Sequence, residues 1–149
     1  AAHRGALDAG GRTIAVLGSG IRRVYPQRNR RLAEQIARSG AVISEAPPEA
    51  SPSAPRLMAR NRLVAALARG VVAVEATGDG GTLQTLRDAL ALGRLIFACD
   101  WQADKPQATG TRTALGMGAE PILGPDAAQY LVAALRNYQA PGPVQAELL

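Results

Sequence analysis

Short apolar stretches alternate with segments of helical periodicity along nearly the whole of this 149-residue chain. The apolar stretches, which predict strands, are Thr13–Leu17, Ala41–Ser44, Val71–Glu75, Leu95–Ala98 and Pro121–Leu123. The helical patterns cover Gln27–Ser39, Leu57–Arg69, Thr82–Leu92, Thr111–Gly118 and Asp126–Tyr138. Strands and helices that alternate in this way favour a parallel sheet covered on both faces. We therefore expect an α/β three-layer sandwich whose mainly parallel sheet has about five strands.

In such a sheet, right-handed crossovers bring the loops that follow the strands to one edge, where ligands bind. We therefore expect one shared crevice, lined by residues 18–27, 45–55, 77–81 and 99–110. The chain shows no internal repeat. We expect one domain at residues 1–138, followed by a linker or tail at residues 139–149.

Several classes of protein are disfavoured by features that the sequence lacks. The longest apolar runs, such as Ile14–Leu17 and Val71–Val74, are far too short to span a bilayer. Residues 1–10 show no signal-peptide pattern. The single cysteine, Cys99, and the single histidine, His3, exclude a disulfide framework and a metal site built from several of either residue. We therefore expect a cytoplasmic protein that makes no membrane contact and holds no metal or cofactor.

Positive charge is concentrated in the first half of the chain. The net charge is +5, and residues 1–70 contain twelve arginines against four acidic residues. The densest group is Arg22, Arg23, Arg28, Arg30 and Arg31. A GC-rich genome accounts for a preference for arginine over lysine, and a solvated helix face is one explanation of the cluster. The other is an anionic ligand, because crowded guanidinium groups repel one another and arginine suits bidentate phosphate contacts.

Two glycine-rich turns each join a predicted strand to a predicted helix. Gly18, Ser19 and Gly20 lack the third glycine of a dinucleotide fingerprint, since Arg23 stands at that position. Gly80, Gly81 and Thr82 are not followed by the lysine of a Walker A loop. Each turn is either a tight turn without a ligand or a set of amides that face an anion near a helix N-terminus. Two such turns beside the arginine cluster suggest a phosphate-bearing polymer or a nucleotide.

The block Arg60, Asn61 and Arg62 belongs to the third predicted helical segment. It can reach the expected crevice and bind an anion there. Equally, Arg60 can bond a backbone carbonyl and hold the preceding loop.

No catalytic constellation is visible in the sequence. Glu75, which ends a predicted strand, is the best-placed candidate carboxylate. Cys99 also follows a strand, but no histidine is available to activate it, so we expect a buried, inert thiol.

The order and spacing of several short motifs resemble the core domain of the DNA-processing protein A (Smf) family, over residues 1–122. The motifs that carry this resemblance are Thr13–Ile21, Val24-Tyr25-Pro26, Asn29, Leu32-Ala33, Ile43-Ser44-Glu45, Pro47-Pro48, Arg60–Leu63, Val71–Ala76, Gly81-Thr82-Leu83 and Gly93-Arg94. Residues 1–7 resemble the helix that precedes the first of these strands in that family.

The resemblance implies a Rossmann-like domain that binds single-stranded DNA, dimerises, and helps to load a RecA-type recombinase during uptake of transforming DNA. It implies no enzymatic activity. The DNA-binding residues predicted from the motifs and charges together are Gly18, Ser19, Gly20, Arg23, Arg28, Arg30, Arg60, Asn61, Arg62, Gly80, Gly81 and Thr82. Tyr25 is near enough to the expected crevice to stack on a base, and Trp101 is more distant. With 3% aromatic residues, binding should depend mainly on phosphates.

The sequence also departs from the family pattern. The acidic residue usual after the first glycine turn is Arg22, and the aromatic-proline pair before the arginine block is Leu57-Met58. The Ser-Gly-Ser-Leu block is Asp79–Leu83. The family's first strand–loop–helix unit and its frequent C-terminal winged helix have no counterpart in these residues, so we expect the chain to begin within the domain.

An enzyme is the alternative function. The Gly80–Thr82 turn and the arginine block also resemble the related phosphoribohydrolase (lysine-decarboxylase-like) family. Those enzymes carry a glutamate where this chain has Thr85, and without that carboxylate hydrolysis loses its acid or stabilising group. A nucleotide-sensing or purely structural module is a third possibility.

Overall fold

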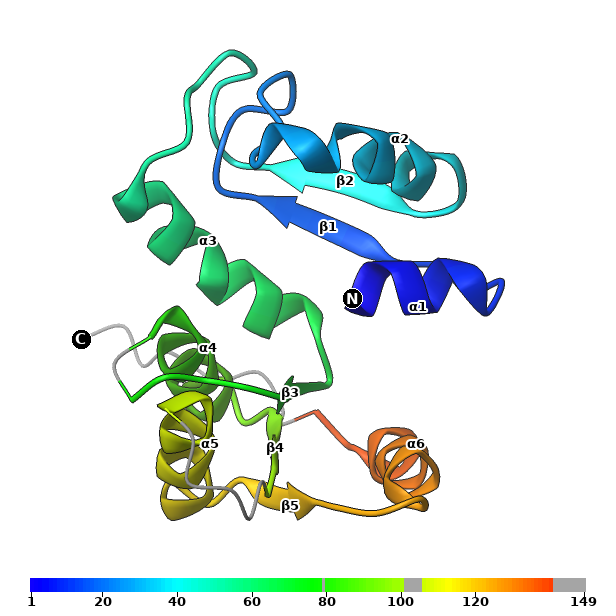
Figure 1. Cartoon of the computed structure of the whole chain (residues 1–149), viewed down its shortest axis with the longest axis vertical. Helices are drawn as coiled ribbons and strands as arrows, with labels where there is room; N and C mark the ends of the chain where they lie inside the picture. The colour runs from blue at the N-terminus through cyan, green and yellow to red at the C-terminus, as the bar shows by residue number, and fades with distance from the viewer. Residues whose placement is uncertain (79, 101–105, 141–149) are drawn as a thin grey trace, which may run out of the picture. The chain divides into compact units, whose positions relative to one another are not determined.

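A computed structural model describes residues 1–78, 80–100 and 106–140 of the chain (Figure 1). By their contacts they form two compact units, Ala1–Leu63 and the residues from Val64 onward. Each unit is described by itself. In the part of the chain that is described, no helix has the length and apolar character needed to cross a membrane.

The first unit is built on two parallel strands, β1 (Ile14–Leu17) and β2 (Ala41–Ser44). Their register pairs Ile14 with Ala41 and Leu17 with Ser44. Between them the chain forms a 3₁₀ turn, η1 (Gln27–Asn29), and helix α2 (Arg30–Ser39), while α1 (Ala2–Asp8) precedes β1. Helix α3 (Ala54–Leu67) begins in this unit and ends in the second.

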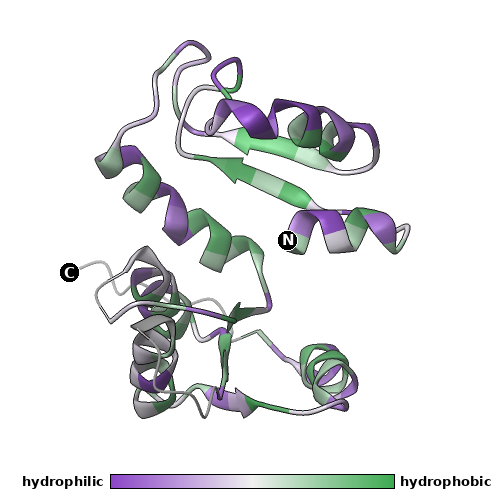
Figure 2. Ribbon diagram, viewed as in Figure 1, coloured by the Kyte–Doolittle hydropathy of each residue, from purple (hydrophilic) through white to green (hydrophobic). Residues whose placement is uncertain are grey.

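Helix α2 covers one face of the β1–β2 pair because its apolar residues recur at helical spacing (Figure 1). Ala33 and Ile36, three residues apart, are buried against the strands. The rest of the helix is mostly hydrophilic, whereas the two strands are mostly hydrophobic (Figure 2). The amphipathic pattern thus determines which side of α2 is left for solvent and ligands.

The second unit contains three parallel strands in the order β3 (Gly70–Ala73), β4 (Leu95–Cys99), β5 (Glu120–Ile122). Helices α4 (Gly81–Ala91) and α5 (Pro106–Gly116) lie on one side of this sheet, and α6 (Ala127–Asn137) lies on the other (Figure 1).

The core of the second unit follows from the alternation of side chains along β4. Ile96 and Ala98 join the cluster formed with α4 and α5, which includes the buried Leu83 and Leu86. Phe97 points to the opposite face, where its ring meets Tyr130 of α6 edge-on at a centroid distance of 6.4 Å. A strand buried on both faces is typical of a parallel sheet covered by helices on each side.

The predicted fold class is confirmed, because the strands pair in parallel and helices cover them. The prediction of one sheet of about five strands was wrong: the five described strands form a two-stranded and a three-stranded sheet. Alternating apolar stretches predict that strands exist, but hydrogen bonds between distant segments decide which strands pair. The assignment of residues 1–138 to one domain stays a prediction, and most of the predicted tail lies outside the described residues.

The helix boundaries also differ from those predicted. Helix α3 begins at Ala54 and α5 at Pro106, a few residues before the predicted starts at Leu57 and Thr111. Proline is tolerated in the first turn of a helix, where its missing N–H has no partner to lose. The opening helix α1 confirms the expectation based on residues 1–7.

Candidate nucleic-acid interface

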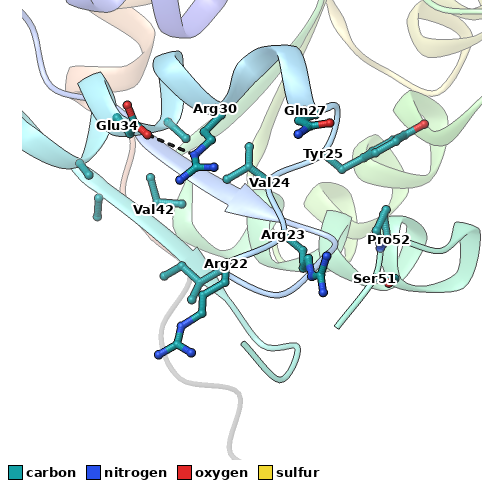
Figure 3. Close-up of a pocket in the computed structure, with 14 residues that line it drawn as sticks. Arg22, Arg23, Val24, Tyr25, Gln27, Arg30, Glu34, Val42, Ser51 and Pro52 are labelled. Carbon is teal, nitrogen blue, oxygen red and sulfur yellow. Dashed lines mark hydrogen bonds and ion pairs between the residues drawn. The ribbon is translucent and has the colours of Figure 1, made fainter. Parts of the chain in front are cut away.

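An open cavity of about 940 Å³ lies in the first unit, next to the turn that follows β1 and the beginning of α2 (Figure 3). Arginines 22, 23 and 30 are among the residues that line it. Its less polar lining includes Val24 and Val42, with Ala33 and Ala37 of α2. A cavity with an apolar interior and guanidinium groups beside it matches a ligand that combines planar or apolar groups with phosphates.

Three of the five clustered arginines form ion pairs, with two different carboxylates. Arg22 and Arg23 both contact Glu49, at 3.2 and 3.3 Å. Arg30 contacts Glu34, four residues along α2, at 3.3 Å (Figure 3). Arg28 is exposed and has no ion pair among the described residues.

Arg31, at the second position of α2, is likewise exposed and unpaired within the described part of the chain. Two carboxylates thus pair with three of the five clustered arginines, and the cluster keeps an excess of positive charge. Exposed ion pairs such as these contribute only about 0–1 kcal/mol each, so an anion can replace the carboxylates.

The turn Gly18-Ser19-Gly20 is packed against the rest of the first unit. Ser19 is buried, and its hydroxyl donates to the Arg23 carbonyl at 2.7 Å. The Gly20 amide donates to the Ala50 carbonyl at 2.8 Å. Of the two interpretations left open for this turn, a tight turn is what the structure shows at Gly20, whose N–H group already has a backbone partner.

Close packing also explains why glycines occupy this turn. A Cβ atom at Gly20 would stand 2.2 Å from the carbonyl oxygens of Pro47 and Pro48, and one at Gly18 would stand 2.7 Å from Leu57 Cδ2. Only glycine allows the loop after β2 to approach the turn so closely. The close packing of the turn therefore fixes the backbone of the neighbouring arginines beside the cavity.

The residues of the block Arg60-Asn61-Arg62 on α3 lie in different environments. The Arg60 guanidinium donates to the Val16 carbonyl of β1, and its Nε donates to Asn61 Oδ1 at 3.1 Å. Burial lowers the pKa of Arg60. Of the two roles left open for Arg60, a backbone carbonyl bond is what the structure shows, and this bond ties α3 to β1.

Arg62 is exposed and donates to both oxygens of Glu45, the first at 2.7 Å. Glu45 directly follows β2, so this ion pair lies at the carboxyl end of that strand. The pair is accessible to solvent and is not part of the lining of the cavity.

The second glycine turn belongs to the second unit. Gly80 precedes α4, and its carbonyl accepts the Leu83 amide at 3.1 Å. Gly81 begins that helix, and Thr82 is half-buried in its first turn. Thr85 is buried and its hydroxyl donates to the Gly81 carbonyl at 3.0 Å.

The expected meeting of both glycine turns in one crevice stays a prediction, because the turns belong to different units. Trp101 and Asp79 lie outside the described residues. Asn61 and Gly81 both have interaction partners in the structure.

Other candidate groups offer little chemistry in this structure. Burial raises the pKa of the Cys99 thiol, which disfavours the reactive thiolate. His3 Nδ1 lies 2.8 Å from Thr13 Oγ1, and burial lowers the pKa of its ring. Among the described residues, no group of three His, Cys, Asp or Glu side chains is arranged to hold a metal ion.

Sequence reasoning missed the part that Glu49 plays beside the arginines. The sequence places residues 45–55 at the expected crevice but assigns no partner to Glu49, which is 27 residues from Arg22. The sequence carried one hint, the Pro47-Pro48 pair, which predicts a stiff turn around the acidic residue. Nothing in the local pattern indicated which basic residues would face it.

Comparison with known proteins gives consistent matches. Residues 1–133 match the family described as DNA recombination-mediator protein A. Protein Smf of Synechocystis sp. is 41% identical over 122 residues, which are 82% of this chain and 31% of that protein. The chain therefore spans about a third of the length of this curated relative.

Two solved structures resemble the fold. DNA processing protein A of Streptococcus pneumoniae has a TM-score of 0.78 at 33% identity, over 93% of this chain and 47% of that one. DNA processing protein A of Helicobacter pylori, whose structure concerns its single-stranded DNA binding mode, has a TM-score of 0.74 at 26% identity. That match covers 85% of this chain and 58% of the other.

Proposed function

This chain belongs to the DNA recombination-mediator protein A family, and from that membership we propose that it binds single-stranded DNA at the arginine-lined cavity of its first unit. The observation that carries the proposal is the excess of guanidinium groups around that cavity. The structure of the Helicobacter pylori relative, which concerns single-stranded DNA, supports the choice of ligand. The family match agrees with the resemblance carried by the sequence motifs.

The chemistry of the cavity suits a single strand better than a duplex. Guanidinium groups bind phosphates in bidentate fashion and stack on bases. The exposed side chain of Tyr25, which is among the lining residues, offers a ring for one unpaired base (Figure 3). Duplex DNA keeps its bases stacked inside, so it would use the guanidinium groups but not the ring.

We propose different roles for the residues predicted from the motifs. Arg23, Arg28 and Arg30 contact phosphates directly. Gly18, Ser19, Gly20 and Arg60 hold the surrounding framework, as their packing and backbone bonds suggest. Arg62, Asn61 and the turn Gly80-Gly81-Thr82 are proposed as further DNA contacts.

At the level of the cell, we propose that the protein acts without enzymatic activity in the cytoplasm, as a homodimer. It would receive DNA taken up during transformation and help to load a RecA-type recombinase onto it. The family description as a recombination mediator supports this role. A relative from Bacillus subtilis carries the name of a DNA processing protein, which agrees with a binding function.

Arg28 lies in the 3₁₀ turn η1, and Arg30 is the first residue of α2. Replacing Arg28 and Arg30 together by alanine should weaken binding of a labelled oligo-dT and flatten its salt dependence. The slope of log affinity against log salt should fall by about 0.7 for each phosphate of the single strand that the variant no longer neutralises. Fluorescence anisotropy at several salt concentrations measures both quantities.

Arg38→Ala is the matched control, because Arg38 is an exposed arginine in the last turn of α2, at the other end of the helix from Arg30, and does not line the cavity. It should leave the salt slope nearly unchanged. Equal slopes for wild type and the double variant would contradict the site. Incubation with adenosine monophosphate tests the hydrolase alternative, since release of adenine would show an enzyme.

A further inference from the structure

One carboxylate outside the cavity meets two of the arginines that line it. Glu49 Oε1 lies 3.2 Å from Arg22 Nη1, and Glu49 Oε2 lies 3.3 Å from Arg23 Nε. Each oxygen of the carboxylate therefore contacts a different guanidinium. Two oxygens of one phosphate group can make the same pair of contacts. Glu49 thus has the charge and geometry of a phosphate substitute at this edge of the cavity.

The backbone holds Glu49 in this position. The Arg22 amide donates to the Pro48 carbonyl at 3.0 Å, and the Gly20 amide donates to the Ala50 carbonyl at 2.8 Å. A further bond, from the Ala50 amide to the Pro47 carbonyl at 2.8 Å, closes the turn that contains Glu49. The residues on both sides of Glu49 are therefore bonded to the turn that carries the arginines. The backbone is already ordered when the carboxylate meets them, so only side-chain entropy is lost.

The contacts are nevertheless open to exchange. The side chains of Arg22, Arg23 and Glu49 are 72%, 60% and 59% exposed. Ion pairs that are exposed to this degree are weak and are screened by salt. The Arg60 guanidinium differs, because it bonds a backbone carbonyl and is half-buried. An incoming anion can therefore displace Glu49 from its two arginines, whereas Arg60 stays in place.

We propose that Glu49 is a built-in competitor for phosphate, which occupies Arg22 and Arg23 in the free protein and is displaced when the DNA backbone binds. This inference rests on the proposed function. Competition of this kind lowers the affinity for every anion at this edge of the cavity. A ligand with several linked phosphates loses least, because its other phosphates remain bound at Arg28 and Arg30 while one replaces Glu49. Glu49 thereby favours a nucleic-acid strand over isolated phosphate.

Glu49→Gln tests the competition, because it removes the charge and keeps the shape of the side chain. The variant should bind oligo-dT about fivefold more tightly than wild type at low salt, the size expected for exposed ion pairs. Its salt slope should be steeper by about 0.7, since one more positive charge is free to meet a phosphate. Asp8→Asn is the matched control: Asp8 is an exposed acid of the same unit, without an ion pair among the described residues.

A second comparison isolates the arginines. In a background that carries Arg22→Ala and Arg23→Ala, the Glu49→Gln change should no longer tighten binding. A persistent gain in that background would overturn the proposal, because the effect would then come from general charge. The proposal is also overturned if wild type binds oligo-dT but the Glu49→Gln and Asp8→Asn variants bind it with equal affinity. That result would leave the proposed function intact.

Titration with inorganic phosphate separates the inference from the proposed function. NMR signals of the Arg22 and Arg23 Nε–H groups report directly on the two guanidinium groups. Tighter phosphate binding in Glu49→Gln than in Asp8→Asn would support competition by Glu49, even if no variant bound oligo-dT and the proposed function failed. Equal phosphate binding in both variants would overturn the inference.

Discussion

Two arginines on α3, only two residues apart, show how differently one residue type can be placed. The Arg60 guanidinium bonds the Val16 carbonyl of β1 and is half-buried. The Arg62 guanidinium is exposed and pairs with Glu45. The first holds backbone in place, and the second is a surface ion pair. Their spacing in the sequence contains no information on this difference.

At this scale, we expect the two arginines to differ in their effect on stability. Arg60→Ala should lower the free energy of unfolding by about 1–3 kcal/mol, because the Val16 carbonyl loses its partner inside the first unit. Arg62→Ala should cost less than about 1 kcal/mol, as exposed ion pairs do. Urea denaturation followed by circular dichroism measures both. Equal losses for the two variants would contradict the assignment.

At the scale of the elements, backbone hydrogen bonds join the turn after β1 to the loop after β2. Backbone bonds join Gly20 to Ala50 and Arg22 to Pro48, at the carboxyl ends of two paired strands. This joint fixes the Arg22 and Arg23 backbone beside the cavity. Glycine at position 20 is required because the carbonyls of the loop lie where a Cβ atom would be.

Gly20→Ala tests this joint. The added Cβ would stand 2.2 Å from two backbone oxygens, so the loop must move, and overpacking of this kind costs about 1–3 kcal/mol. Gly5→Ala is the control, because a Cβ there meets nothing within 4 Å and Gly5 lies inside α1. It should stabilise the helix by about 0.5–1 kcal/mol. Thermal melts of both variants measure the change in melting temperature. A Gly20→Ala variant as stable as wild type would show that the turn and the loop are not packed this closely.

At the scale of the whole molecule, the described residues form two compact units, each with its own buried side chains. The first buries Val16 of β1 and Ile36 of α2. The second buries Leu83 and Leu86 of α4 against its three-stranded sheet. The arginine-lined cavity belongs entirely to the first unit.

We therefore expect a core substitution in the second unit to act mainly within that unit. Leu86→Ala should cost about 2–5 kcal/mol, because the side chain is fully buried. Leu90→Ala on the same helix should cost less, since Leu90 is 41% exposed. Amide hydrogen exchange should show reduced protection in β3 and β4 and a smaller reduction in β1 and β2. A uniform reduction across all five strands would indicate that the units unfold together.

The sequence by itself determined the type and order of the elements. Hydrophobic periodicity is a local property, so the pattern that predicts each strand or helix is contained in the residues of that element. It also carried the motifs of the family, from the Gly18-Ser19-Gly20 turn to the arginine block. The tertiary structure decided how the strands pair and which arginines remain available. Arg60 and Arg22 are equivalent as charges in the sequence, yet one bonds Val16 and the other meets Glu49. Those partners lie 44 and 27 residues away, and only the folded chain brings them together.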